Sequence, residues 1–315
     1  MLSVILPVYN GEDTIETCLA SLAAQTLSPM EVVLVDDGST DATLSVAQRF
    51  LEQNSHLQHQ IISIAHVGSS KAREAGIRTA KGDIVGFIDA DDTVSAQYYE
   101  KLLSKMGEAT IVCGAFTQVS SAGQKRIWNE ETGDLSPAEA KTQLFEQRGV
   151  YQYLWNKLFR KEVLLQAEFP DAMIAEDLML VLQGIGRCSS IRVTNEDGYC
   201  YTRKKGTQSK SGYDERYCRM HQQLHRLLNS EKEAVKPALQ RFVLWHDLSV
   251  LMAMGRNQNR DLQMEKEIVS FVQAHIQDFM SHSNYGSAVR LMAWVVARMP
   301  WAAYPIARVV RIFQG

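Results

Sequence analysis

Short apolar runs alternate with segments of helical periodicity through the first 120 residues. Between the first two runs, Ile15, Cys18, Leu19 and Leu22 recur at the spacing of one helix face. Continuously apolar strands that alternate with amphipathic helices are typical of a mainly parallel sheet with helices on both faces. We therefore predict an α/β fold. The expected strands lie at 2–8, 31–35, 61–65, 84–88 and 110–116, and the expected helices include 69–80 and 96–106.

The pattern changes after residue 120. Shorter elements follow to about 210, among them a helix opened by Ser136-Pro137 and two strands near 191–194 and 198–202. From 213 onward the apolar residues recur at helical spacing. We therefore expect an α/β domain at 1–212 and a helical C-terminal region at 213–315.

The composition is that of a globular protein and excludes several functional classes. Of the 315 residues, 45% are apolar and 22% are charged, which argues against disorder. A net charge of −3 provides no basic field, so no nucleic-acid partner is expected. The five cysteines are dispersed and contain no C-x-x-C pair, which favours free thiols. The N-terminus lacks the basic region of a signal peptide, and no apolar run reaches the roughly 18–20 residues of a spanning helix. We therefore expect a cytoplasmic protein.

Three polar turns should meet at one edge of the sheet. They are "PVYNGED" after the first strand, "DDGSTD" after the second and "DADD" after the fourth. Ligands of open α/β sheets bind at this edge, beyond the carboxyl ends of the strands. Asp89, Asp91 and Asp92 repel one another there, so a cation should complete the site. A divalent metal held by oxygen ligands is one interpretation, and a solvated turn is the other.

The same edge suits a nucleotide. The sequence has neither a G-x-G-x-x-G motif after the first strand nor a G-x-x-x-x-G-K-[ST] motif, which disfavours a dinucleotide dehydrogenase or a P-loop enzyme. Asp37 could contact a base or a ribose, and Arg73 and Arg78 could neutralise phosphates. Asp91 with a divalent ion could stabilise a departing diphosphate. For "DDGSTD", the alternative is a helix start capped by Ser39 or Thr40.

The order of these segments resembles that of the family 2 glycosyltransferases, which have the GT-A (Rossmann-like) fold. The segments are P-V-Y-N, E-V-V-L-V-D-D-G-S-T-D, A-R-E-A-G-I, D-A-D-D, W-N-K-L-F-R-K and A-E-D. The resemblance is dense over 2–92, sparser to about 210 and absent from the tail. It departs from the family at Glu74, where asparagine is usual, and at Ala96, where proline is common.

The resemblance implies roles for individual residues. The D-x-D of Asp89 and Asp91 would bind ribose and metal, with Asp91 as the ligand of a Mn²⁺ or Mg²⁺ ion. Asp37 would contact the base, and Arg73 would lie near the base and the diphosphate. The full set expected at the donor nucleotide is Pro7, Tyr9, Asp37, Arg73 and Asp89.

A second acidic pair, Glu176-Asp177, lies in "IAEDLML" (174–180). Inverting glycosyl transfer needs one general base to take the proton of the acceptor hydroxyl. The family's E-D motif supplies that base, and Asp177 is the residue that we assign to it, with Glu176 in the sugar or acceptor pocket. Both carboxylates would also favour a helix start, and this interpretation is compatible with the first.

Three further segments are candidates with open alternatives. Trp155, Asn156 and Lys157 of "WNKLFRK" are candidates for the sugar or acceptor pocket, although Trp155 suits the core equally well. In "YTRKKGTQSKSG" (201–212), the resemblance implies a loop that closes over the diphosphate through Arg203 or Lys205, and a solvated loop is the alternative. Cys218, His221 and His225 share one helix face, but no second ligand pair has matching spacing. A packed or exposed face is therefore favoured over zinc binding.

These observations predict a metal-dependent inverting glycosyltransferase. It would move a hexosyl or N-acetylhexosaminyl group from a nucleotide diphospho-sugar, expected to be a UDP-sugar, to a hydroxyl of a glycan or lipid-linked acceptor, as in cell-surface polysaccharide synthesis. Residues 1–120 would form the nucleotide-binding part and 121–212 the acceptor part. One alternative is a sugar nucleotidyltransferase, which should have a glycine-rich basic loop where this chain has "PVYNGEDT". The other is a non-catalytic nucleotide-sugar-binding protein, although both acidic motifs are present.

The last 30 residues carry a separate signal. From Gly286 onward the chain has four arginines and no acid. Trp294, Trp301 and Tyr304 are types favoured at a membrane interface, and arginines can meet anionic lipid there. We expect peripheral contact with the inner face of the cell membrane. The alternative is a helical pair packed on the GT-A core, with its arginines reaching water.

Overall fold

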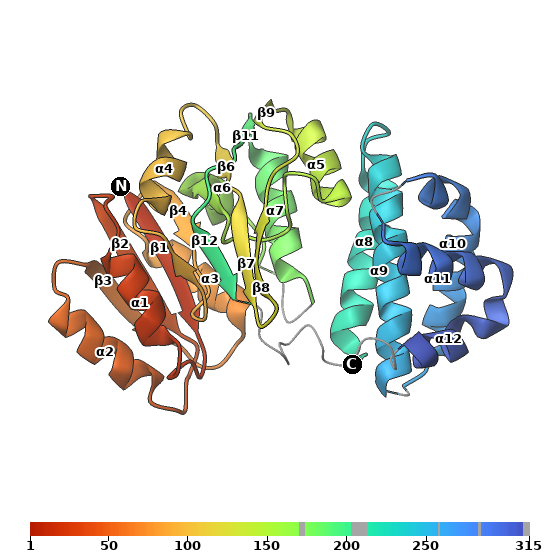
Figure 1. Cartoon of the computed structure of the whole chain (residues 1–315), viewed down its shortest axis with the longest axis horizontal. Helices are drawn as coiled ribbons and strands as arrows, with labels where there is room; N and C mark the ends of the chain where they lie inside the picture. Colours follow the sequence, from red (N-terminus) through yellow and green to blue (C-terminus); the bar gives the residue numbers. More distant parts are fainter. Residues whose placement is uncertain (170–173, 203–212, 258, 283–284, 311–315) are drawn as a thin grey trace. The chain divides into compact units, whose positions relative to one another are not determined.

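The computed structural model describes residues 1–169, 174–202, 213–257, 259–282 and 285–310. It divides the chain into two compact units, Met1–Lys205 and Gly206–Gly315 (Figure 1). The domain boundary expected at 212 ends the segment 203–212, which lies outside the described residues, and so do the candidate loop residues Arg203 and Lys205.

A mixed sheet forms the centre of the first unit. β1, β2 and β3 pair in parallel, and β4 pairs in parallel with the other side of β1, so the direction of winding reverses between β1 and β4. β10 runs antiparallel between β4 and β6. β1 and β2 are buried along their whole length, as expected for strands covered on both faces. Across the described sheet the order is β3 (Gln58–Ser63), β2 (Met30–Asp36), β1 (Leu2–Val8), β4 (Ile84–Phe87), β10 (Lys157–Arg160), β6 (Ile111–Cys113), β11 (Ile191–Val193) and β9 (Gly133–Leu135).

Helices flank this sheet (Figure 1). Crossovers between parallel strands are right-handed, so the reversal of winding places α1 and α2 on one face and α3 on the other. α3 packs closely on β1 because it carries Gly76, where an added Cβ would lie 2.5 Å from Ile5 Cγ2. The expected helix start at Ser136 is confirmed by a capping box with Glu139. The helices of this unit are α1 (Ile15–Ala23), α2 (Thr43–Gln53), α3 (Ser69–Thr79), α4 (Tyr98–Ser104), α5 (Pro137–Glu146), α6 (Lys161–Leu165) and α7 (Glu176–Arg187).

The single strand expected at 110–116 is wrong. The chain forms β6 in the large sheet and then enters a second sheet as β7. Between them, Gly114 N donates to Asn156 O and Ala115 N donates to Glu196 O, so loops bind the backbone there and interrupt the strand. The strand expected at 61–65 begins and ends earlier, at Gln58 and Ser63. The second sheet has the order β5 (Thr93–Val94), β12 (Tyr199–Thr202), β7 (Phe116–Ser120) and β8 (Gly123–Ile127).

The second unit is helical, as predicted. The side chains of Asp214 and Asp261 cap the starts of α8 and α10. α9 contacts the other main helices of this unit. Its elements are α8 (Glu215–Ser230), α9 (Lys236–Asn257), α10 (Leu262–Ser281), α11 (Ser287–Arg298), the 3₁₀ turn η2 (Pro300–Ala302) and α12 (Ala303–Val310).

The tail of this unit buries one side and exposes the other. Met292, Val296 and Ala303 are buried, whereas Trp294 and Trp301 are 45% and 74% exposed. In the part of the chain that the structure describes, none of the helices has the combination of length and apolar composition that spanning a bilayer requires.

Candidate active site

The loop after β3 fixes the carboxylate of Asp37. Oδ1 accepts a hydrogen bond from Val67 N at 2.8 Å, and Oδ2 accepts one from Gly68 N at 3.0 Å. His66 Nδ1 lies 2.9 Å from Oδ2. Gly68 supplies the turn that aims these amides, since its φ of 95° is one that glycine adopts readily. Asp37 is therefore a buried anchor between two loops at the predicted edge of the sheet.

An exposed aromatic pair lies beside this anchor. The rings of Tyr9 and His66 stack with centroids 4.0 Å apart, and Tyr9 is 45% exposed. Pro7 is buried in β1 and pairs with Val35 of β2. It therefore fixes the end of the strand from which Tyr9 follows. His66 was not among the predicted site residues, because the prediction used only the polar turns after the first, second and fourth strands. The turn "AHVG" after the third strand ends at the same edge of the sheet and contains His66.

Arg73 joins the two acidic motifs. Its side chain projects from α3 and is almost fully buried. The guanidinium Nη2 lies 3.0 Å from Asp89 Oδ1. Nη1 lies 3.0 Å from Asp177 Oδ1 and 3.2 Å from Glu176 Oε1. Burial alone would lower the pKa of Arg73, but the carboxylates of Asp177, Asp89 and Glu176 together raise it. Arg73 is therefore a permanent cation between residues assigned to the donor and to the acceptor. Arg78, the other phosphate candidate, is largely exposed and pairs with Glu74 at 2.9 Å.

The three carboxylates of the acidic turn have different environments. Asp92 is buried, where its Oδ2 accepts a hydrogen bond from Tyr199 Oη and its Oδ1 accepts one from Thr202 N, both at 2.7 Å. Burial and repulsion by Asp89 and Asp91 raise the pKa of Asp92 to about 8. Asp89 and Asp91 remain partly exposed. Asp92 thus anchors the turn to β12.

The acidic turn fits a hard divalent cation. Asp89 and Asp91 offer only carboxylate oxygens, the donors that Mg²⁺ and Mn²⁺ prefer. Burial first, and then the charges of these aspartates, raise the pKa of both Asp92 and the thiol of Cys18. A cation that relieves this repulsion would be held by Asp91, with Asp89 beside it.

Asp177 has the environment of a general base. It lies in the first turn of α7, after Ala175, which adopts a left-handed conformation. Burial raises the pKa of Asp177 to about 6, against the opposing effect of Arg73, and repulsion by Asp89 and Glu176 adds to the increase. A base works best when its pKa lies near the working pH. Glu176 is tied instead to α3, since it accepts hydrogen bonds from Ser69 and Arg73.

Trp155, Asn156 and Lys157 follow the loop that contacts Asp177. All three are buried. Lys157 Nζ donates to Tyr151 O at 2.6 Å, Tyr153 O at 2.7 Å and Asn156 Oδ1 at 2.8 Å, and burial lowers its pKa to about 8. These bonds fix the loop whose Leu154 N lies 3.5 Å from Asp177 Oδ2.

An aromatic stack surrounds Trp155. Its ring lies nearly parallel to three tyrosine rings. The distances between ring centroids are 4.4 Å to Tyr199, 4.7 Å to Tyr153 and 5.4 Å to Tyr201. Tyr153 and Tyr201 are half-buried and so extend the stack toward solvent. Of these rings only Trp155 was predicted at the site, although the tyrosines stand at alternating positions of "YQYLW" and "YCYT".

Comparison with known proteins identifies the family. The sequence model described as glycosyl transferase family 2 matches residues 3–166, more than half of the chain. The chain belongs to this family. The uncharacterized glycosyltransferase EpsJ of Bacillus subtilis is 28% identical over 294 residues, which cover 86% of this chain and 84% of EpsJ. The poly(ribitol-phosphate) beta-N-acetylglucosaminyltransferase TarS of Staphylococcus aureus is 27% identical over 219 residues, or 67% of this chain and 37% of TarS.

Solved structures confirm the fold of this family 2 glycosyltransferase. TarS 1–349 of S. aureus, in complex with UDP-GlcNAc, aligns with a TM-score of 0.68 at 20% identity over 99% of this chain and 91% of that one. The mannosyltransferase PcManGT of Pyrobaculum calidifontis, in complex with GDP-Man and Mn²⁺, aligns with a TM-score of 0.59 at 18% identity. The alignment covers 99% of this chain and 87% of PcManGT. The GT-A prediction is thus confirmed. Membership of a glycosyltransferase family excludes the two alternatives considered from the sequence, a sugar nucleotidyltransferase and a non-catalytic nucleotide-sugar-binding protein.

Proposed function

We propose that the protein is a metal-dependent inverting glycosyltransferase that uses a UDP-sugar. The observation that carries this proposal is the contact of one buried arginine, Arg73, with Asp89 on one side and Asp177 on the other. Inverting transfer needs a leaving-group site and a base on opposite sides of the anomeric carbon, and these two aspartates are candidates for the two sides. The UDP-GlcNAc complex of TarS, which has the same fold, supports a UDP-sugar as donor.

The chemistry assigned to the chain is a single displacement. Asp177 Oδ removes the proton of the acceptor hydroxyl while that oxygen bonds to the anomeric carbon. The bond from this carbon to the phosphate oxygen breaks at the same time, and its electron pair leaves with the nucleoside diphosphate. A carboxylate with a pKa of about 6 is ionised at neutral pH and basic enough for this transfer. Arg73 orients Asp177 through its 3.0 Å contact with Oδ1.

The donor nucleotide is assigned to the edge formed by the turns after β1, β2 and β3. The exposed face of Tyr9, backed by His66, suits a planar base, and Asp37 holds the surrounding amides in place. A divalent ion held by Asp91, when bound, would neutralise the diphosphate and stabilise its departure. The Mn²⁺ complex of PcManGT, a structural relative, supports this assignment.

The acceptor is assigned to the side of Asp177 and the aromatic stack. Tyr153 and Tyr201, backed by Trp155, offer flat faces on which a sugar ring can pack. We infer a glycan or lipid-linked hydroxyl as acceptor, in polysaccharide synthesis in the cytoplasm. Peripheral membrane contact through the tail remains part of this proposal, because exposed Trp294 and Trp301 accompany its arginines.

The test is a donor screen that follows release of the nucleotide from a panel of UDP- and GDP-sugars. We expect one UDP-sugar to support transfer with Mn²⁺ or Mg²⁺. Asp91→Ala should abolish transfer and weaken UDP binding in calorimetry with metal present. Asp83→Asn, which changes an exposed carboxylate, is the matched control and should behave as the wild type. Full transfer activity in a chelator would contradict the role of the metal.

A further inference from the structure

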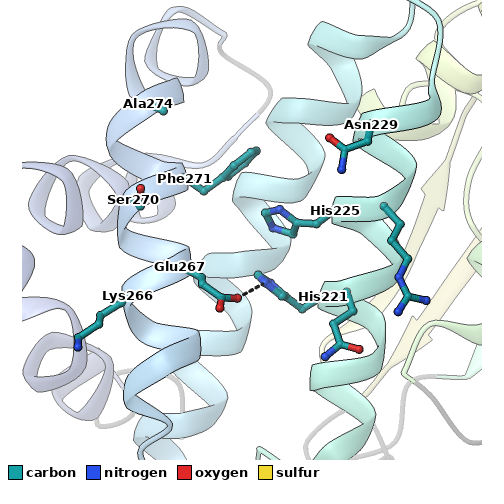
Figure 2. A pocket seen from close by; sticks show the side chains of 10 residues that line it. His221, His225, Asn229, Lys266, Glu267, Ser270, Phe271 and Ala274 are labelled. Atoms are coloured by element: carbon teal, nitrogen blue, oxygen red, sulfur yellow. Dashed lines mark ion pairs between the residues drawn. The ribbon is translucent and has the colours of Figure 1, made fainter.

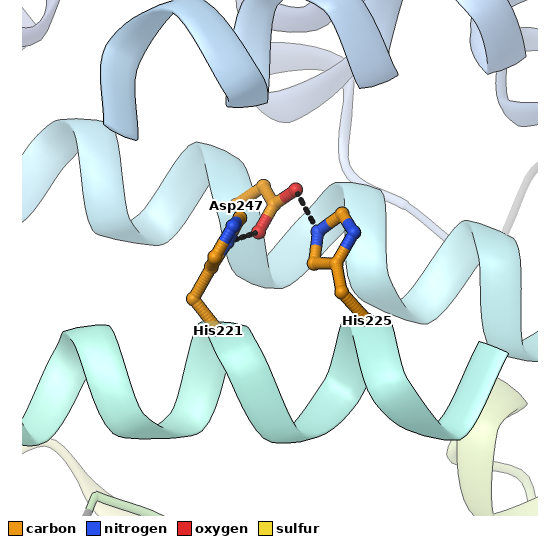
Figure 3. Close-up of side chains that lie close together, drawn as sticks. All are labelled: His221, His225 and Asp247. Carbon is orange, nitrogen blue, oxygen red and sulfur yellow. Dashed lines mark hydrogen bonds and ion pairs between the residues drawn. The ribbon is translucent and has the colours of Figure 1, made fainter. Parts of the chain in front are cut away.

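The helical unit contains a second group of potential metal ligands, separate from the acidic turn. The side chains of His221 and His225 project from one face of α8 toward the side chain of Asp247 on α9 (Figure 3). We propose that His221, His225 and Asp247 bind a zinc ion that joins α8 to α9. This proposal does not depend on the sugar donor or on the metal of the acidic turn.

The ligand atoms already converge. His221 Nδ1 lies 2.8 Å from Asp247 Oδ1, and His225 Nε2 lies 3.0 Å from Asp247 Oδ2. All three ligand atoms lie within 4.8 Å of one another. Zinc binds imidazole nitrogen and carboxylate oxygen at about 2.0–2.2 Å, so ligands around one ion lie a little over 3 Å apart. Small side-chain rotations would open the present contacts to that spacing.

The charge of Asp247 also calls for a cation. Its side chain is fully buried. Within the part of the chain that the structure describes, every ion pair of Asp247 is with an imidazole, namely His221, His225 and, at 3.9 Å, His246. A buried carboxylate needs a compensating charge, and a divalent ion between the two histidines would supply one.

A second carboxylate is placed as an outer partner of one ligand. His221 turns its other ring nitrogen, Nε2, toward Glu267 Oε2 of α10 at 3.6 Å (Figure 2). Histidines that bind a metal commonly direct the remaining N–H to a carboxylate, which fixes the ring and increases its basicity. α10 therefore contributes to the same cluster without a direct ligand.

The cluster is also open to solvent on one side. His225 is 28% exposed and lines a pocket of about 700 Å³ together with Glu267 and Phe271 (Figure 2). Three protein ligands and access to a pocket leave a fourth position for water or a small ligand. Imidazole donors favour zinc over Mg²⁺ and Mn²⁺, which prefer oxygen, so this site and the acidic turn should select different ions.

The ligand set differs from the one that the sequence suggested. Cys218 shares the helix face with the two histidines, but its Sγ lies 2.9 Å from Tyr213 Oη. The third ligand comes from α9, 22 residues beyond His225. No local spacing on α8 could have revealed it.

Zinc binding by the full-length protein tests the proposal. The protein is stripped with a chelator, incubated with Zn²⁺, dialysed and analysed by mass spectrometry, and its affinity is measured by competition with a chromophoric chelator. We expect one zinc per chain in the wild type. His225→Gln should weaken binding by at least about 10- to 100-fold, and Glu267→Gln by about 10-fold or more. His282→Gln, which changes a half-exposed histidine beside Asp278, is the matched control and should bind like the wild type.

Two measurements keep the outcome decisive. Circular dichroism reports whether each variant is folded, and His225 is exposed enough for its variant to fold. Asp91→Ala should retain the full zinc content, which separates this site from the acidic turn. A wild type that retains no zinc, or a folded His225→Gln protein that binds zinc with unchanged affinity, would overturn the proposal. In that case the cluster is only a hydrogen-bonded one.

Discussion

Replacing Asp177 with asparagine should stop turnover and stabilise the protein. The side chain keeps its shape but loses its negative charge and its ability to accept a proton. General-base catalysis contributes about 10²–10⁴-fold, so kcat should fall by at least that lower limit. UDP binding should weaken only slightly, because Asp177 is assigned to the acceptor side and acts on the donor side only through Asp89 and Arg73.

The gain in stability follows from the pKa. A pKa of about 6, against the ordinary 3.8, means that the folded protein disfavours the charged form by up to about 3 kcal/mol. The folded state holds the proton more tightly than the unfolded chain, so this contribution to stability is complete at low pH and is lost as the pH rises through about 6. The uncharged side chain of the Asp177→Asn variant avoids the loss. This variant should exceed the wild type by about 1–3 kcal/mol at pH 7.5 and match it near pH 4.

Calorimetry in the presence of a chelator measures this difference. For a unit of about 200 residues, each kcal/mol corresponds to a rise in Tm of about 2–4 °C. Asp83→Asn controls for the loss of one negative charge at the surface, and it should change neither Tm nor kcat. A variant that is less stable than the wild type at pH 7.5, or whose kcat falls by less than about 100-fold, would refute the reasoning.

Three further outcomes follow from the same structure. Between pH 7 and pH 5, kcat/KM should fall about tenfold as Asp177 is protonated, whereas a flat profile would assign the base elsewhere. Lys157→Met removes the ammonium that binds the carbonyls of Tyr151 and Tyr153 and should cost about 2–4 kcal/mol in urea unfolding. A cost below about 0.5 kcal/mol would contradict that role. Full-length protein should sediment with anionic vesicles, and replacing both Trp294 and Trp301 with glutamine should reduce this; if neither protein sediments, the tail is a packing element.

The sequence predicted the edge of the sheet well because strands leave a local signature. Burial on both faces makes β1, β2 and β4 read as apolar runs, so the polar turns that follow them can be assigned to one edge without coordinates. Asp37 and Asp89 were located in this way. Gly114 shows the limit of this method, because the apolar run continues through it while hydrogen bonds from distant loops divide the strand.

Contacts across long stretches of chain could not be predicted. Arg73 and Asp177 are separated by more than one hundred residues, and the packing of α3 on the sheet and on α6, which also contacts α7, brings them together. Lys157 looks like a ligand-binding cation in sequence, yet backbone carbonyls surround it, a role that depends on the path of residues 151–156. His66 is the exception, since the rule used for the other turns would have identified it.

The contact of Arg73 with both acidic motifs would couple the proposed donor side of the site to its proposed acceptor side. Asp89 raises the pKa of Asp177 through repulsion, so positive charge brought to Asp89 by a bound donor complex must lower the pKa of Asp177. Such coupling is reciprocal, and ionised Asp177 must in turn strengthen donor binding. A donor-bound protein would then keep its base ionised to a lower pH than the free protein does.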